Sequence, residues 1–466
     1  MIKGRKRTKA EALNRQIAHQ TAPVGQYLGI MPDTHTQLTI RDSVYDIVPL
    51  DALAAQLINT EAFLRLQRIR QLGFVYRIWP GATHTRYEHS IGVYHLALRA
   101  LRSLTQRAEG GLQFSEDELQ QSLPQIFLAA ALLHDIGHYP YSHSIEELGA
   151  PIIPHEINSA AIIMSGEIAG ALLAHDIDPG RVAALVAGNE KEHGAALVLR
   201  NLLSGALDID KLDYLPRDAR SCNVPYGGVD VARLLSSLRI EDSSGEMELV
   251  VDSKGISPLN SLTHARQEMF DNIYWHHTGR AFTAMLLRAV QEAVSSETLP
   301  PDDLITYTDE TLLQALTEPN MPAASQELAR RLQLRKPHKM ALELSAQAGK
   351  IYQKVGALYW DAAKRCETEI TLSQKLAAIV QKPLPEWAVL IDIPKPEKWE
   401  MNTKVLFQTP PVGMRRLMSW TEATGQTPDD LSRYETYQRR IRIIVMEDFR
   451  EAAKLHMETI LRSNFL

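Results

Sequence analysis

Apolar residues recur at intervals of three and four positions over much of the chain, which is the pattern of amphipathic helices. This spacing predicts helices over residues 90–104, 123–136, 157–174, 182–187, 195–203 and 267–290. Residues 239–252 differ, because a Ser-Ser-Gly turn followed by a Val-rich run predicts a short β-hairpin. Pro, β-branched and aromatic residues within 387–411 predict further strands. The expected fold class is therefore mainly α, with a small β-hairpin and a C-terminal α+β region.

The chain contains no internal repeat and no low-complexity segment. A polar, Pro-containing stretch at 299–303 is the best candidate for a boundary. We therefore predict an N-terminal extension over residues 1–45, a helical core over 46–298 and a C-terminal α+β region over 299–466.

Composition narrows the class of ligand. With 45% hydrophobic and 23% charged residues the chain is typical of globular proteins. Its formal charge of -6 gives no overall attraction to nucleic acid or to an anionic membrane, so a polyanion must meet a local basic pocket. This favours a small ligand over a long polymer. The basic segment 3–7 is either a solvated tail or a contact to nucleic acid or nucleotide at an oligomer interface.

Two cysteines, Cys222 and Cys366, are too few for a disulfide framework or a cysteine zinc site. No apolar run reaches the length of a membrane span, and polar sequence follows the basic start where a signal peptide would be apolar. We therefore expect a cytoplasmic protein without a membrane partner, in which any metal is bound by His and carboxylate side chains.

Histidines are concentrated in one part of the chain. Seven of the sixteen lie between residues 84 and 155: His84, His89, His95, His134, His138, His143 and His155. The pair His134-Asp135 ends the apolar run 126–133, and neutral imidazole and carboxylate are both good donors to divalent ions. His138 is one helical turn after His134, so both rings are expected to face one side, with Asp135 reaching the same ion from the helix end.

A catalytic metal site needs further ligands but keeps positions open for water or substrate. His89 is one candidate, at the point where a Gly-containing loop enters a helix. Asp210 is the other, on a predicted helix where Asp213 and Tyr214 fall near the same face. Pro216 is expected to end or kink that helix.

Four segments, 63–73, 80–93, 133–138 and 208–214, together resemble the HD-domain phosphohydrolases. They resemble most closely the deoxynucleoside triphosphate triphosphohydrolases related to the vertebrate sterile-alpha-motif and HD-domain enzyme. The likeness runs from Ile58 to His277, about half of the chain. It implies the HD helical bundle for residues 46–298, and one divalent ion (Mn, Fe, Zn, Ni or Mg) bound by His89, His134, Asp135 and Asp210. It also allows a Mg²⁺ ion that arrives with the nucleotide.

The reaction that this resemblance implies is hydrolysis of a deoxynucleoside triphosphate to deoxynucleoside and inorganic triphosphate, with attack at the α-phosphorus. His138 and His155 resemble the family's catalytic histidines, and Glu146 or Glu156 would keep His155 protonated. The residues expected at the phosphates are Arg86, His143, Lys211 and Arg266. Those expected at the sugar are Gln71, Leu72, Tyr214, Asp218 and Tyr274, the last stacked over the sugar so as to disfavour a 2'-hydroxyl.

The chain also departs from its relatives. Phe270 and His277 stand where related enzymes often carry a histidine and a lysine, which leaves base preference open. Asn59, Leu64 and Gln67 replace the Asp, Gln and Arg that recognise guanine in members activated by a guanine nucleotide, so a switch of that design is not expected. Related enzymes assemble as dimers of dimers, which implies a homo-oligomer, dimer or tetramer, with the C-terminal region as a candidate interface.

Two other functions remain open. A nucleoside monophosphatase or cyclic-nucleotide phosphodiesterase would keep the metal ligands but need fewer basic groups. A nucleotide-sensing or nucleic-acid-binding protein would need no proton-transfer groups such as His138 and His155.

Several candidate residues also have purely structural interpretations. Arg86 and Lys211 are alternatively ion-paired surface residues, and Tyr274 alternatively packs in an aromatic cluster. His95 is expected in the core or at the surface, and His84 behind another site residue.

Overall fold

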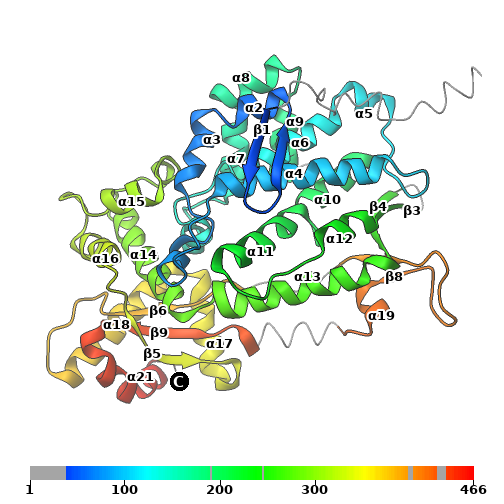
Figure 1. The fold of residues 1–466 in the computed structure, drawn as a ribbon. Coiled ribbons are helices and arrows are strands. Elements are labelled where there is room, and N and C mark those ends of the chain that lie inside the picture. The colour runs from blue at the N-terminus through cyan, green and yellow to red at the C-terminus, as the bar shows by residue number, and fades with distance from the viewer. Residues whose placement is uncertain (1–37, 189–191, 244–245, 397–401, 428–436, 466) are drawn as a thin grey trace, which may run out of the picture.

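The computed structural model (Figure 1) describes residues 38–188, 192–243, 246–396, 402–427 and 437–465. The basic segment 3–7 and most of the predicted N-terminal extension lie outside the described residues. The end of that extension belongs to an antiparallel hairpin of β1 (Leu38–Asp42) and β2 (Asp46–Leu50), which the sequence analysis did not predict.

Helices form most of the structure up to residue 300, as the apolar spacing predicts (Figure 1). They are α2 (Ala52–Leu57), α3 (Glu61–Arg65), α4 (Arg86–Thr105), α5 (Glu116–Gln120), α6 (Leu123–Leu133), α7 (His155–Ile163), α8 (Gly166–Ala174), α9 (Pro179–Ala187), α10 (Gly194–Leu203), α11 (Ile209–Cys222), α12 (Val231–Ser237), α13 (Ile256–Met269) and α14 (His277–Ser295). Short helical turns include η2 (Leu66–Arg68), η3 (Gly73–Arg77), η4 (Ser142–Leu148) and η5 (Ser253–Gly255).

The C-terminal part mixes helices with small sheets. Its helices are α15 (Asp309–Ala315), α16 (Ala323–Gln333), α17 (Lys350–Gly356), α18 (Ala362–Val380), α19 (Trp420–Thr424) and α21 (Arg450–Phe465), with the turns η7 (Pro301–Thr306), η8 (Ala346–Ala348), η9 (Ala357–Trp360) and η10 (Glu447–Phe449). Strands β5 (Lys339–Leu344), β9 (Ile441–Val445) and β6 (Val389–Asp392) form an antiparallel sheet in that order.

The predicted β-hairpin is present as β3 (Leu238–Ser243) and β4 (Glu246–Asp252), and strands also occur within 387–411 as predicted. One of them, β7 (Lys404–Leu406), pairs with β4 in parallel and with β8 (Leu417–Ser419) in antiparallel fashion. The chain thus returns from its C-terminal part to the sheet of the helical core. The boundary at 299–303 stays a prediction.

The centre of the core is built on α4, α6 and α11. Helix α6 is buried along almost its whole length because all of its residues except Gln125 and Pro124 are aliphatic or aromatic, and even Pro124 is buried. Helix α4 begins with a capping box in which Thr85 and Glu88 satisfy each other's backbone N–H groups. The side chain of Asp208 caps the first turn of α11. The beginnings of α4 and α11 therefore have fixed positions next to the end of α6.

Three predicted helix boundaries were wrong. The predicted helix 157–174 is two helices, because Ser165 is extended and Gly166 has a φ of 57° between them. The predicted helix 267–290 is interrupted by a π-helical turn, η6 (Phe270–Tyr274), between α13 and α14. Helix α6 ends at Leu133, so His134 to His138 form a turn beyond it.

Pro216 does not end α11, which continues to Cys222. The proline is near the middle of the helix, whose remaining turns pack against the core through Leu215 and Ala219. Tertiary packing outweighs the missing backbone donor here.

In the part of the chain that the structure describes, no single helix is long and apolar enough to cross a membrane. Helices α7 and α8 meet that test only when joined, and they are bent by 57° at the break between them.

Helices α4 and α11 approach each other closely at Gly92, and this contact is testable. A Cβ atom at position 92 would overlap the Asp213 carboxylate and the Arg217 guanidinium. We expect Gly92→Ala to lower the free energy of unfolding by about 2 kcal/mol, because extra atoms in a packed core force shifts. Exposed Gly170 in α8 has open space, so Gly170→Ala should raise it by about 0.5–1 kcal/mol. Chemical denaturation measures the free energy of unfolding of both variants. Equal values for Gly92→Ala and the wild type would contradict the close approach of α4 and α11.

Candidate active site

Three helices bring one donor atom each to a common point. His89 lies in the first turn of α4, His134 directly follows α6, and Asp210 lies in the first turn of α11. Their ligand atoms all lie within 4.8 Å of one another. Nε2 of His89 is 3.0 Å from Asp210 Oδ1, and Nε2 of His134 is 4.0 Å from the same oxygen. Donors bound to one ion at metal–ligand distances of about 2.1 Å are roughly 3–4 Å apart. The group therefore fits a single divalent ion.

Asp135 completes this group. Its Oδ1 lies 3.3 Å from His134 Nε2, and its Oδ2 lies 3.6 Å from His89 Nε2. Asp135 is 3% exposed, and Oδ2 also accepts a hydrogen bond of 2.6 Å from Arg86 Nη1. Burial raises the pKa of Asp135, but the charge of Arg86 and then the neighbouring histidines hold it well below its ordinary value. The structure thus brings together all four residues expected to bind the metal.

Hydrogen bonds at the far side of each ring direct Nε2 towards the common point. Nδ1 of His89 donates to Asp213 Oδ2 at 2.8 Å, and Nδ1 of His134 donates to the Ala131 carbonyl at 3.0 Å. Both Nε2 atoms are buried and make no well-aligned hydrogen bond. A histidine held in this way presents its Nε2 lone pair, as metal-binding histidines do.

The electrostatic field at His89 favours a cation. Burial lowers the pKa of His89, but the adjacent carboxylates of Asp210 and Asp213 outweigh it and raise the pKa to about 10. Burial raises the pKa of Asp210, whereas the close His89 ring lowers it to about 2. The carboxylates that stabilise a proton at Nε2 would equally stabilise a metal ion there.

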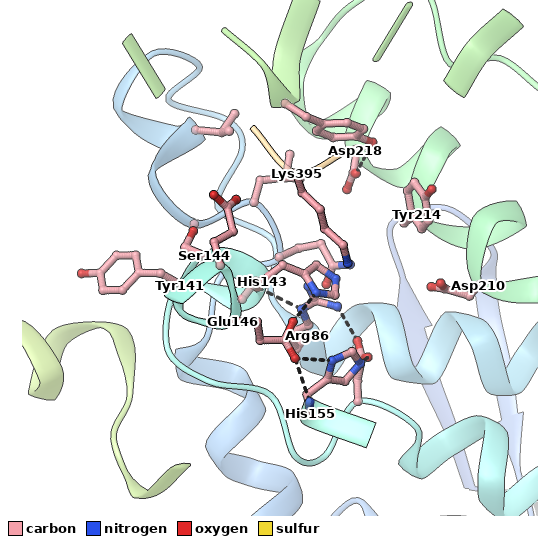
Figure 2. A pocket seen from close by; sticks show the side chains of 18 of the residues that line it. Arg86, Tyr141, His143, Ser144, Glu146, His155, Asp210, Tyr214, Asp218 and Lys395 are labelled. Atoms are coloured by element: carbon pink, nitrogen blue, oxygen red, sulfur yellow. Dashed lines mark hydrogen bonds and ion pairs between the residues drawn. The ribbon is translucent and has the colours of Figure 1, made fainter. Parts of the chain in front are cut away.

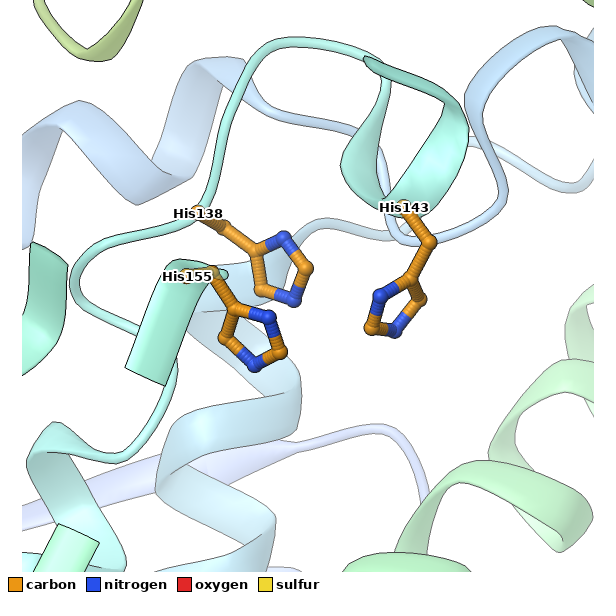
Figure 3. A group of neighbouring side chains, drawn as sticks. All are labelled: His138, His143 and His155. Carbon is orange, nitrogen blue, oxygen red and sulfur yellow. The ribbon is translucent and has the colours of Figure 1, made fainter. Parts of the chain in front are cut away.

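A second group of histidines, His138, His143 and His155, lies next to Asp135 (Figure 3 shows the three rings). The rings of His138 and His155 are stacked with centroids 3.9 Å apart and an interplanar angle of 15°, while His143 faces both at steep angles. Nε2 of His138 and Nε2 of His155 lie 3.5 and 3.7 Å from Asp135 Oδ1. Stacked rings direct their lone pairs in parallel instead of towards one point. This second group therefore suits proton transfer and anion binding better than a metal ion.

One carboxylate organises that second group. Glu146 in η4 accepts from His143 Nδ1 through Oε2 and from His155 Nδ1 through Oε1, both at 2.8 Å. Glu156 is more distant, 3.4 Å from His155 Nδ1, and its side chain is 47% exposed. Of the two carboxylates predicted to hold His155 protonated, Glu146 therefore has the stronger contact.

The two stacked histidines differ in their readiness to bind a proton. Burial lowers the pKa of His155, but the hydrogen bond and charge of Glu146 more than compensate and raise it. Burial, followed by the charges of Arg86 and His155, lowers the pKa of His138 well below its ordinary value. Of the two rings, His155 is therefore the one that binds a proton more readily.

Both groups border one cavity of about 460 Å³ (Figure 2). This volume is in the range of small-molecule sites. Every site residue predicted from the sequence lines the cavity except His89 and His138, which are fully buried. Those in its lining are Gln71, Leu72, Arg86, His134, Asp135, His143, Glu146, His155, Glu156, Asp210, Lys211, Tyr214, Asp218, Arg266 and Tyr274.

Asp218 orients a neighbouring side chain that is expected to contact the sugar. Its Oδ1 is 2.7 Å from His84 Nε2, and its Oδ2 accepts a hydrogen bond of 2.7 Å from the Tyr274 hydroxyl. Burial and then the charge of Asp218 raise the pKa of Tyr274 well above its ordinary value, so the hydroxyl remains a donor. His84 supports Asp218, and the Tyr274 ring also packs edge-on against Phe270 at 4.9 Å. The ring of Tyr274 therefore has a fixed orientation at the cavity wall.

The Arg and Lys side chains that are expected to bind phosphate already contact other groups of the protein. Arg86 pairs with Asp135 and donates from Nε to Ser142 Oγ at 3.0 Å. Lys211 Nζ lies 2.5 Å from Asp208 Oδ2 and 3.0 Å from the Gly205 carbonyl. The Arg266 guanidinium lies 5.4 Å from the centre of the Phe270 ring. Arg86 and Lys211 are thus ion-paired, as their structural interpretation predicts, but Arg86 is buried and not at the surface.

Sequence reasoning did not assign several residues at the site. Asp213 orients His89, and its spacing of three residues from Asp210 is the signal that was available. Arg280, Glu147 and Lys395 line the cavity from segments outside the four motifs, and their sequence neighbourhoods give no comparable signal. His95 packs against the Tyr45 ring at 4.8 Å, and burial lowers its pKa to about 4, which agrees with its expected core role.

Residues 86–218 match the model of the HD domain, and residues 229–461 match that of the HD associated region. The chain belongs to the HD-domain family. The first match begins with α4 and ends within α11, so it contains all four predicted metal ligands.

Curated relatives resemble part of this HD-domain protein. An uncharacterized protein of Methanocaldococcus jannaschii is 30% identical over 59% of this chain and 54% of its own. The deoxynucleoside triphosphate triphosphohydrolase SAMHD1 homolog of Dictyostelium discoideum is 27% identical over 70% of this chain and 64% of its own. The chain spans about half the length of the first curated relatives that it matches.

The fold also has a solved counterpart. The crystal structure of a hypothetical protein from Aquifex aeolicus matches with a TM-score of 0.67 and 25% identity, over 91% of this chain and all of that one. The arrangement of HD domain and associated region is therefore shared across nearly the whole chain.

The two histidine groups predict different effects on metal content. We expect His134→Ala and Asp210→Ala each to lower the metal content of the purified protein at least tenfold, because each removes a direct ligand. His143→Ala alters only the second group and should retain the metal. Elemental analysis of the three variants and the wild type measures this. Loss of the metal from His143→Ala together with its retention in His134→Ala would indicate that the ion binds to the second group of histidines instead.

Proposed function

We propose that this HD-domain hydrolase converts deoxynucleoside triphosphates to deoxynucleoside and inorganic triphosphate, using a divalent ion held by His89, His134, Asp135 and Asp210. The observation that supports this best is the position of Asp135. Its Oδ1 lies between the predicted metal group and the stacked pair of His138 and His155. A cation and a proton donor would therefore act on the same phosphate ester.

A bound divalent ion would polarise a phosphate oxygen and favour attack by water. Attack at the α-phosphorus forms a new P–O bond and breaks the bond to the 5'-oxygen of the sugar. The departing 5'-oxygen takes a proton, and the attacking water gives one up, so the protons balance. His155 is the proposed donor to the leaving oxygen through Nε2, because Glu146 accepts from its Nδ1 and raises the pKa of the ring, which favours a second proton on Nε2.

The proposed substrate has three parts, and the cavity has a group of residues for each. The residues that would bind phosphate oxygens are Arg86, His143, Lys211 and Arg266. Some of these side chains would then contact a phosphate oxygen and their present protein partner at the same time. Tyr274, fixed by Asp218, would lie over the sugar and leave little room for a 2'-hydroxyl. Gln71, Leu72 and Tyr214 would complete the sugar site.

Named relatives support this choice within the HD-domain family. Proteins named deoxynucleoside triphosphate triphosphohydrolase SAMHD1 from Bos taurus and Gallus gallus are each 27% identical over slightly more than half of this chain. Leu64 is exposed, and the Asn59 side chain donates to the Ala55 carbonyl of the preceding helix α2, which is compatible with the expected lack of a guanine switch there. Homo-oligomer formation, cytoplasmic location and the identity of the metal remain predictions.

A product assay tests the proposed reaction. We expect the protein with manganese to release inorganic triphosphate and deoxynucleoside in equal amounts from deoxynucleoside triphosphates, and Asp135→Ala to release neither. Chromatography of the products identifies them. Orthophosphate from monophosphates, or opening of cyclic nucleotides, would favour the other HD-domain hydrolases. Tight nucleotide binding without any product would favour a sensing or binding protein.

The contact between Glu146 and His155 predicts a shift in the pH profile. The reaction needs protonated His155, so activity should fall as pH rises through the pKa of His155. Glu146→Gln removes the carboxylate that raises this pKa, so the descending limb of kcat/KM should move to lower pH by roughly one unit or more. Glu156→Gln is the matched control and should shift it less, because Glu156 is more distant and exposed. Superimposable profiles for Glu146→Gln and wild type would exclude His155 as the donor.

A further inference from the structure

A lysine from the C-terminal part of the chain reaches the cavity. Lys395 follows β6 and lines the same cavity as Asp135 and His155. Figure 2 shows its side chain extending into that cavity, among side chains that come from the helical core. Neither family motif nor sequence pattern singles this lysine out.

The backbone before Lys395 is held firmly. Asp392, at the end of β6, is buried and accepts a hydrogen bond of 2.8 Å from Arg280 Nε. Ile393 is buried in the core, and the Pro394 carbonyl accepts a hydrogen bond of 2.7 Å from Arg439 Nε. Lys395 therefore leaves an anchored segment, and only its own side chain must be ordered on binding a ligand.

The same anchor reaches the catalytic segment. Arg280 in α14 also binds both oxygens of Glu147, at 2.7 and 2.8 Å. Glu147 is next to Glu146 in η4, the segment that organises His143 and His155. The buried Arg280 thus binds both the strand that precedes Lys395 and η4, the segment that carries Glu146.

Lys395 differs from other cations of the cavity in its lack of a carboxylate partner. Arg86 is paired with Asp135, Lys211 with Asp208, and Arg280 with Glu147 and Asp392. Among the residues that the structure describes, Lys395 has no partner in an ion pair or hydrogen bond, and it is exposed. An anionic ligand can therefore pair with the Lys395 ammonium group without breaking an existing ion pair.

The charge of the cavity makes such a cation necessary for a polyphosphate. Six carboxylates line the cavity: Asp135, Glu146, Glu147, Glu156, Asp210 and Asp218. A nucleoside triphosphate adds several negative charges, whereas Arg86 and Arg280 are already paired with Asp135 and Glu147, and Lys211 is paired with Asp208. A metal ion compensates charge only near its own ligands.

We propose that Lys395 binds the phosphate chain of the nucleotide, so that the C-terminal part of the chain supplies one of the substrate-binding residues. This rests on the proposed function for the nature of the ligand. Lys395 lies within the HD associated region, residues 229–461, and would add to Arg266 and Tyr274, which the same region contributes to the cavity.

Binding of inorganic tripolyphosphate to the intact protein tests this without turnover. We expect Lys395→Ala to weaken tripolyphosphate binding about tenfold in calorimetry, which is the usual loss for one charge-assisted contact. Binding of a deoxynucleoside should not change, and Lys395→Arg should retain most of the affinity. Lys382→Ala is the matched control, because Lys382 is exposed in the same C-terminal part but does not line the cavity.

Each outcome bears on one proposal separately. Equal tripolyphosphate binding by Lys395→Ala and wild type, or no binding by wild type, overturns the role of Lys395 even where triphosphate release from deoxynucleotides is observed. An equal loss for tripolyphosphate and deoxynucleoside also overturns it, because it indicates a merely structural effect. Lysine-dependent tripolyphosphate binding in a protein that cleaves no deoxynucleoside triphosphate supports the role of Lys395 and refutes the proposed function.

Discussion

A carboxylate removed from water needs positive charge around it, because the loss of hydration otherwise costs several kcal/mol. Asp135 is such a carboxylate, almost completely buried at the end of the most apolar helix of the core. Arg86 compensates one of its oxygens directly, and histidines from both groups surround the other. Helices α4, α6 and α7 are therefore positioned so that Arg86, His134 and His155 surround this carboxylate.

The turn that carries Asp135 is held in place by specific contacts with α7. The turn 134–138 packs against the first turns of α7, where Ser159 Oγ accepts from the Gly137 N–H at 2.9 Å and donates to the His134 carbonyl at 2.8 Å. A side chain at Gly137 would overlap the backbone of α7. Because His155 is the first residue of α7, the same contact places His155 beside His138. Packing of one helix on one turn thus couples the two histidine groups.

The C-terminal part contributes to the site through buried charge as well as through Lys395. Asp309, the first residue of α15, accepts hydrogen bonds from the backbone N–H groups of Tyr141 and Arg70, at 2.7 and 3.1 Å. Burial raises the pKa of Asp309 to about 6. Together with Arg280, this residue holds the segment that carries His143 and Glu146 from outside the HD domain. The HD associated region is therefore part of the structural support of the site.

The sequence by itself predicted the helical class and the hairpin at 239–252, because helix and strand periodicity are local properties of the chain. It indicated His89, His134, Asp135 and Asp210 through ligand chemistry and family resemblance, and their role as metal ligands stays a prediction. It did not determine where helices break, since the breaks at Ser165 and after Leu133 depend on backbone conformation and on packing against other helices. Nor did it determine that His134 and His138, four residues apart, belong to different groups. Only the tertiary structure decided this, because the helix ends between them and the partners of each ring come from distant segments.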